Sequence, residues 1–356
     1  MSTSGKGKGR EQAPLPGPSS GSANPAASLS ALWAYLLPAL THIMKSPQND
    51  ASATAKAPAI DMAFYSGIHT ACYNYFTSQN ENHFPPTSAA RAMGTTDRDT
   101  QSGNDLYEQL DKFFLETARE VMLGLPQDDD TELVDYIVPC FNRYSAGATS
   151  VNRLLNYINR HYVRRAVEED RGWLRVSDIV DLPAGTTAAT LATTATALSM
   201  SREDAESREK LARLLKEKRV VELRKWGYDG SAQSPMGAAE AEASAEAASA
   251  PDRIVSVVSL AHRRFRTEVL EPLLAVPVIK GHKPKKKIPK AATGPPPSIP
   301  KGRLARSVRN LLESKGGDEE EKARLAADLL RALRLSGIRT DHPLRKRLDK
   351  FVTTGG

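Results

Sequence analysis

Apolar residues recur at intervals of three and four along five successive stretches of this chain, the spacing that places them on one face of an α-helix. The stretches are residues 28–44, 61–80, 105–125, 128–145 and 150–170. No convincing run of alternating apolar and polar residues, the pattern of a strand, accompanies them. The sequence therefore predicts an all-α protein. Pro38 is expected to bend the first helix or to mark its start, because an interior proline costs ~3 kcal/mol.

The second stretch, DMAFYSGIHTACYNYFTSQN, carries no formal charge after Asp61, which we expect to cap the helix. On a helical wheel its apolar residues cover an arc of roughly 200°, about twice the usual core-facing stripe. One stripe comprises Phe64, Ile68, Ala71 and Tyr75, and a second comprises Met62, Tyr65, His69, Cys72, Tyr73 and Phe76. Two interpretations are open. The helix is buried on all sides within a bundle, or its second stripe, rich in Tyr and His, docks a partner protein.

Amino-acid composition divides the rest of the chain into segments that are expected to fold and segments of low complexity. Residues 1–27 are rich in Gly, Pro and Ser and are expected to form a disordered leader, followed by the five helices within residues 28–180. Residues 181–251 include the acidic, Ala-rich AAEAEASAEAASA and are predicted to be a low-complexity, largely disordered insertion. The helical pattern returns over residues 252–276. A basic, Pro-rich linker is expected over residues 277–301, and two amphipathic helices, RLARSVRNLLES and EEEKARLAADLLRALRLSG, within residues 302–356.

Few residues in the sequence suit catalysis or metal binding. The chain has 356 residues, a formal net charge of +7 and two cysteines, which are too few for a disulfide framework or a zinc cluster. Cys72 has no neighbouring cation to lower its pKa, and His161 has no nucleophile at a recognisable spacing. We therefore expect no catalytic, cofactor or metal site. The apolar stretch over residues 27–44 is interrupted by Pro38 and polar residues, which argues against a membrane span.

Two motifs together resemble the cullin family, the scaffolds of multisubunit ubiquitin ligases. The family's N-terminal signature pairs a YT-x-x-YNYCTS-like helix with a YLNRH-(W/Y)-V-(R/K)-R helix. This chain has HTACYNYFTS at residues 69–78 and YINRHYVRR at residues 157–165. ALWAYLLPALTHIM and DLYEQLDKFFLE are similar to the family's first and third helices, and VVSLAHRRFRTEVLEPL and RLARSVRNLLES to later segments. The similarity is greatest to the cullin type that binds Skp1-like adaptors.

The resemblance implies a fold and a binding surface. Cullin repeats are bundles of about five helices, and the second and fifth helices of the first repeat form the adaptor-binding face. His69 and Tyr73 match two adaptor-facing aromatic positions of the second helix, although the family commonly has Tyr where His69 stands. Tyr157 matches an adaptor-facing aromatic position of the fifth helix. The adaptor-binding residues implied by the resemblance are Met62, Ser66, His69, Tyr73, Arg153, Asn156 and Tyr157.

The resemblance also implies a role. A cullin of this type is a non-catalytic scaffold of an SCF-type ubiquitin ligase, which reaches F-box substrate receptors through the adaptor and acts in ubiquitin-dependent protein degradation. The family's C-terminal domain, which recruits the RING protein, has no counterpart in this sequence. We therefore expect a truncated or divergent cullin that binds an adaptor without the RING subunit, and we expect it in the cytoplasm and nucleus.

A second functional interpretation rests on the basic segments. KGHKPKKKIPK at residues 280–290 holds six lysines, and RHYVRR and HRRFR add basic helix faces. Prolines interrupt the lysine run, so it would act as a solvated linker, a nuclear-import signal or a flexible electrostatic arm without base readout. The alternative function is a helical interaction protein that has lost ligase activity and associates weakly with nucleic acid.

Overall fold

The computed structural model describes residues 28–46, 57–81, 103–127, 130–175, 213–214, 216–231, 236–276, 302–314 and 318–354, and these residues form helices and connecting turns without a strand. The first half of the chain contributes α1 (Leu29–Lys45), α2 (Met62–Glu81), α3 (Asn104–Leu123) and α4 (Leu133–Leu154). A last segment of three pieces follows: α5 (Asn156–Ile158), the π-helical turn η2 (Asn159–Val163) and α6 (Arg164–Glu168). The predicted all-α class is confirmed. The expected leader and Lys/Pro linker lie outside the described residues.

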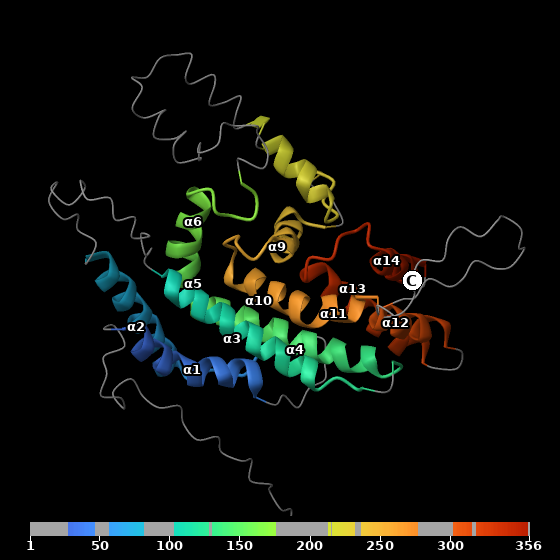
Figure 1. Ribbon diagram of the computed structural model, residues 1–356, viewed down its shortest axis with the longest axis horizontal. Helices are drawn as coiled ribbons and strands as arrows, with labels where there is room; N and C mark the ends of the chain where they lie inside the picture. The colour runs from blue at the N-terminus through green and yellow to red at the C-terminus, as the bar shows by residue number, and fades with distance from the viewer. Residues whose placement is uncertain are drawn as a thin grey trace, which may run out of the picture.

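The second half folds back over the first. It comprises α9 (Ala238–Ala248), α10 (Val257–Phe265), the π-helical turn η4 (Arg266–Leu270), α11 (Glu271–Leu274), α12 (Arg303–Glu313), α13 (Glu319–Leu335) and α14 (Pro343–Thr354). In Figure 1, α3 and α4 form a middle layer, with α1 and α2 on one side and α10 and α11 on the other. The sequence pattern does not predict α14, because its buried Leu344 and Leu348 stand among Arg and Lys residues.

Helix α4 lies at the centre of the bundle and packs against α1, α2, α10, α12 and α13. Its helical path is longer than predicted, because residues 146–149 continue it where a break between two helices was expected. Gly147 lies where α4 meets α1: a Cβ there would lie 2.5 Å from the Met44 sulfur, so a larger residue would require the Met44 side chain to shift. The boundary between the fourth and fifth helices therefore falls at Leu155.

Helix α1 runs unbroken through Pro38, so neither a new start nor an end occurs there. The carbonyl that Pro38 leaves without a helical partner belongs to Ala34, which is exposed and can be hydrated. Ser28 caps the helix, its hydroxyl accepting a hydrogen bond from the Ala31 amide at 3.2 Å. The proline is thus accommodated on the outer side of a helix that the core holds in place.

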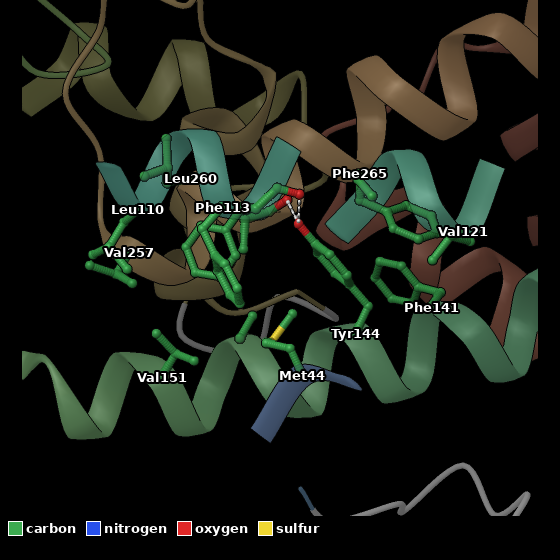
Figure 2. Close-up of a cluster of buried hydrophobic side chains, with 14 of the residues drawn as sticks. Met44, Leu110, Phe113, Val121, Phe141, Tyr144, Val151, Val257, Leu260 and Phe265 are labelled. Atoms are coloured by element: carbon green, nitrogen blue, oxygen red, sulfur yellow. Dashed lines mark hydrogen bonds between the residues drawn. The ribbon is translucent and has the colours of Figure 1, made fainter. Parts of the chain in front are cut away.

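Two buried tyrosines join the middle layer to the segment after the insertion. The Tyr144 hydroxyl of α4 lies 3.2 Å from the Phe114 carbonyl of α3 and 3.1 Å from the Ala261 carbonyl of α10 (Figure 2). The Tyr107 hydroxyl of α3 donates to the Val255 carbonyl at 2.9 Å and accepts from the Val255 amide at 3.1 Å. Burial raises the pKa of both phenols, which keeps them protonated as donors.

Part of the predicted insertion is folded. The acidic, Ala-rich tract forms α9, which packs against α10 and α13 and buries Ala241, Ser244, Ala245 and Ala247. The prediction of disorder is wrong for this tract, because small side chains permit a close helix approach that a count of large apolar residues does not register. Gly337 faces it with φ +76°, and a Cβ there would lie 2.6 Å from the Ser244 carbonyl oxygen.

A buried histidine makes the fold pH-sensitive. His262 of α10 is 2% exposed, and its Nε2 lies 3.0 Å from the Ser145 hydroxyl of α4. Burial, aided by the positive charge of Arg331, lowers the pKa of His262 to about 4. Between that value and the ordinary pKa of about 6.5 the unfolded chain binds more protons, so the free energy of unfolding falls as the pH falls.

We predict that His262→Gln removes this dependence. The difference in the free energy of unfolding, variant minus wild type, is expected to rise by about 2–3 kcal/mol when the pH is lowered from ~7 to ~4.5. The neutral amide has no proton to gain, whereas the unfolded wild type gains one. Urea denaturation of both proteins at the two pH values measures the difference. An unchanged gap between the two proteins would show that His262 does not control the acid sensitivity.

Candidate functional site

Helix α2 has one buried side and one exposed side. Asp61 caps it, its carboxylate accepting from the Ala63 amide at 3.2 Å, as the sequence predicts. The buried side comprises Phe64, Ile68, Ala71, Cys72, Tyr75 and Phe76. The exposed side comprises Met62, Ala63, Ser66, His69, Thr70, Tyr73 and Asn74. The helix is therefore not buried on all sides, and Cys72 and Phe76 of the predicted second stripe belong to the core.

Tyr157 of α5 is the centre of an aromatic cluster on the exposed side. Its ring centroid lies 6.3 Å from that of His69 and 5.9 Å from that of Tyr73, both edge-on. Phe76 lies 5.2 Å away beneath it, and His161 stacks on it at 4.0 Å. The name aromatic cluster is used below for these five residues. Phe76 belongs to the predicted second stripe, and neither it nor His161 is among the seven predicted adaptor-binding residues, although each lies within one helical turn of one of them.

Local backbone features hold Tyr157 beside α2. The chain leaves the α-helix at Leu155, with φ −106° and ψ 26°, and continues through the π-helical turn η2. Asn159 fixes that turn, because its amide nitrogen donates to Asn152 Oδ1 at 2.7 Å and its Oδ1 accepts from the Val257 amide at 3.0 Å. Such interruptions of an α-helix redirect the side chains that follow.

Gly103, at the start of α3, sets the position of Phe76. It has φ +94°, and a Cβ there would lie 2.2 Å from the Phe76 ring. Glycine meets both conditions without strain. Phe76 consequently lies over the backbone of α3, and Tyr157 lies over Phe76. The cluster is thus supported from the core outward.

The other predicted residues extend the same surface. Met62, 75% exposed, and the exposed Arg153 line a groove of about 440 Å³ between α1, α2 and α4, together with Ile43, Ile60, Tyr65 and Leu154 among others. The Tyr65 hydroxyl lies 3.5 Å from the Arg153 carbonyl. Ser66 is exposed one turn after Met62, and Asn156 is half-buried next to Tyr157. Of the seven predicted adaptor-binding residues, His69, Tyr73 and Tyr157 are thus in ring contact. Met62 and Arg153 lie in one groove.

Two members of the aromatic cluster, Tyr157 and His161, have pKa values shifted toward their neutral forms. Burial and the adjacent Tyr73 raise the pKa of the Tyr157 phenol, so it stays protonated. Burial and the neighbouring Arg160 lower the pKa of His161, which keeps its imidazole neutral. No side chain described on α2, residues 62–78, carries a formal charge. A partner can therefore cover the rings of Tyr157 and His161 without desolvating an ion, which is the costly part of burying polar groups.

The described part of the chain holds little that could act as a nucleophile or bind a metal. Burial raises the pKa of the Cys72 thiol to about 12, and the pKa of the half-buried Cys140 is also raised by burial. No group of three His, Cys, Asp or Glu side chains gathers at metal-binding distance among the described residues. No described helix is long and apolar enough to cross a membrane.

Comparison with known proteins identifies one curated relative. The chain is 25% identical over 158 residues to Cell division control protein 53 of Saccharomyces cerevisiae, which is a cullin. The match covers 42% of this chain and 18% of the yeast protein, so the chain spans about a fifth of the length of that relative. No family model and no solved structure matches. These findings support a cullin-like relationship, which agrees with the helical bundle.

The two sides of α2 predict different mutational costs for neighbouring tyrosines. Tyr75 is 2% exposed, so Tyr75→Ala is expected to lower the free energy of unfolding by about 3–5 kcal/mol. Tyr73 is 50% exposed, so Tyr73→Ala is expected to cost less than about 1 kcal/mol. Urea denaturation of the two variants measures both values. Equal costs would contradict the assignment of the two sides.

Proposed function

We propose that this chain is a non-catalytic scaffold subunit of a cullin-RING ubiquitin ligase and that the aromatic cluster binds a Skp1-like adaptor. The observation that carries the proposal is the group formed by the exposed His69 and Tyr73 and the half-buried Tyr157, held edge to face on two helices. Through the adaptor the chain would bring F-box substrate receptors into an SCF-type complex for ubiquitin-dependent protein degradation. Such complexes work in the cytoplasm and nucleus, which is where we place the chain.

The physical properties of the surface suit a protein partner. Tyr combines a large apolar area with a polar tip and is enriched in protein interfaces. The ring contacts around Tyr157 restrict the rotamers of its neighbours before binding, which lowers the entropy lost on association. Next to the cluster, the groove lined by Met62 and Tyr65 offers a mostly apolar recess for one anchoring side chain.

Two observations support the cullin assignment. The motif pair HTACYNYFTS and YINRHYVRR lies on α2 and on the segment α5–η2–α6, and the structure packs α2 against α5. The similarity to the yeast cullin is the second observation. The yeast protein is much longer than the matched region, so the adaptor, the F-box receptors and the ligase complex are proposals for this chain.

The described basic residues give the nucleic-acid alternative little support. Arg164 and Arg165 each pair with a glutamate one turn away, at 3.0 Å. In HRRFR, the buried Arg263 donates to the Arg253 carbonyl at 2.9 Å, and Arg264 pairs with Asp111. Arg263 and Arg264 therefore serve the fold, and adjacent glutamates offset the charges of the exposed Arg164 and Arg165. The lysine run at residues 280–290 lies outside the described residues.

A pull-down with the purified Skp1-like protein of the same organism tests the proposal. Tyr73→Ala combined with Tyr157→Ala is expected to weaken binding at least ~30-fold, because truncating a central interface aromatic commonly costs 2 kcal/mol or more. Leu123→Ala combined with Val276→Ala is the matched control, because both residues are exposed and apolar and lie outside the cluster.

The outcomes of the pull-down test adaptor binding and the location of the binding site separately. Binding by the wild type and the control but not by the tyrosine variant supports the proposal. Absence of binding by the wild type would rule out the adaptor model. Equal binding by all three proteins would place the adaptor site on another surface.

A further inference from the structure

A large cavity lies where α9 meets the loop between α13 and α14. Its volume is about 860 Å³, within the range of small-molecule sites. Four further elements complete the walls: residues 173–174, the helix of residues 216–224, Trp226 and Arg266 of η4. Nothing in the proposed scaffold role uses this cavity.

The cavity walls are fixed by buried contacts. Trp226 is 6% exposed and packs in a small core of its own with Leu223, Met236, Ala241 and Ala245. The Trp173 indole donates to the Glu242 carboxylate at 3.2 Å, which sets the orientation of its ring. Two aromatic rings therefore stand in defined positions at one cavity.

The loop that closes the cavity is tied to the same wall. Arg345, 3% exposed, donates to the Ile338 carbonyl at 2.6 Å and to the Trp226 carbonyl at 3.1 Å. Thr340 donates to the Lys225 carbonyl through its amide at 3.2 Å and through its hydroxyl at 3.0 Å. The cavity is thus preformed, and its lining loop is held by hydrogen bonds to buried backbone groups.

Only some of the cationic side chains that line the cavity form ion pairs or hydrogen bonds with described residues. Arg266 donates to the Ala248 carbonyl at 3.0 Å and lies 3.5 Å from the Glu271 carboxylate. Lys218 and Arg339, by contrast, make no ion pair or side-chain hydrogen bond within the described part of the chain. Arg339 lies over the Trp226 ring, with its guanidinium carbon 5.8 Å from the ring centroid.

The acidic side chains of the lining do not cancel this charge. Glu222 is paired with Lys225, with N–O distances of 2.8 and 2.6 Å. Asp341 is exposed and is the remaining carboxylate of the described lining. Two cations without a carboxylate partner therefore face a cavity that also presents indole rings.

We propose that this cavity binds a small aromatic anion, whose ring packs against Trp226 and Trp173 and whose acidic group pairs with Lys218 and Arg339. A guanidinium stacked on an indole keeps its in-plane N–H groups available to an anion. Partial enclosure strengthens the ion pair relative to one in open water. The proposal is independent of adaptor binding.

Two dyes of matched shape provide the test. The probes are 8-anilino-1-naphthalenesulfonate and N-phenyl-1-naphthylamine, which share the aromatic frame and differ by the sulfonate. Fluorescence titration of the full chain measures both affinities. The sulfonate dye is expected to bind with a stoichiometry near one and about tenfold more tightly than the neutral dye. Comparable affinities would overturn the proposal, because the cavity would then bind both dyes through their shared aromatic frame alone.

Substitutions locate the binding and test the sign of the charge effect. Lys218→Gln combined with Arg339→Gln is expected to weaken sulfonate binding about tenfold, and Asp341→Asn is expected to strengthen it. Arg224→Gln combined with Lys346→Gln is the control, because both residues are exposed cations outside the lining and remove the same net charge. Equal losses in the two double variants, or weaker binding by Asp341→Asn, would overturn the proposal.

Discussion

The burial of helix α4 on nearly all sides is the constraint on which the rest of the structure depends. Five other helices pack against it, and its polar groups must therefore find partners within the protein. The Tyr144 hydroxyl meets carbonyls of α3 and α10, and the Ser145 hydroxyl meets His262. These bonds determine which helices can lie beside α4. They also join the segment after residue 251 to the first helices, so both halves of the chain share one core.

The two-sided character of α2 follows from this arrangement. The helix lies at the edge of the bundle, against α1, α4 and α5, so its buried residues occupy one side only. Its other side carries aromatic and small polar residues where surface helices normally carry Lys or Glu. Covering the Tyr73 and Tyr157 rings costs less free energy than covering Lys or Glu side chains, because uncharged rings are cheaper to desolvate. The aromatic cluster is therefore suited to a protein interface, and the cullin-like relationship suggests its partner.

Much of the first bundle could be predicted from the sequence, because helical spacing of large apolar residues reports burial directly. The division of α2 is an example: Phe64, Ile68 and Tyr75 are buried as predicted, and His69 and Tyr73 are exposed. Cys72 and Phe76 could not be assigned by the wheel, because their burial depends on contacts with other helices, as the approach of Phe76 to Gly103 shows. Asp61 could be recognised as the cap because capping is a local interaction.

Features that depend on distant or small residues could not be predicted. Helix α9 packs through Ala and Ser, whose burial reflects the position of Gly337 far along the chain. Asn159, which begins the π-helical turn after Tyr157, accepts a hydrogen bond from the Val257 amide, about a hundred residues away in sequence. The cavity beside Trp226 arises from segments whose individual sequences carry no binding motif. Each of these features is a property of the tertiary arrangement.

Hydrogen–deuterium exchange of the full chain, with and without the Skp1-like protein of the same organism, tests the central claim most directly. The account predicts slower exchange in two segments when the adaptor binds, residues 62–78 of α2 and residues 155–163 of the α5–η2 segment. Exchange in α9 and α14 should stay unchanged. A complex that forms while these two segments exchange at their free rates would contradict the account.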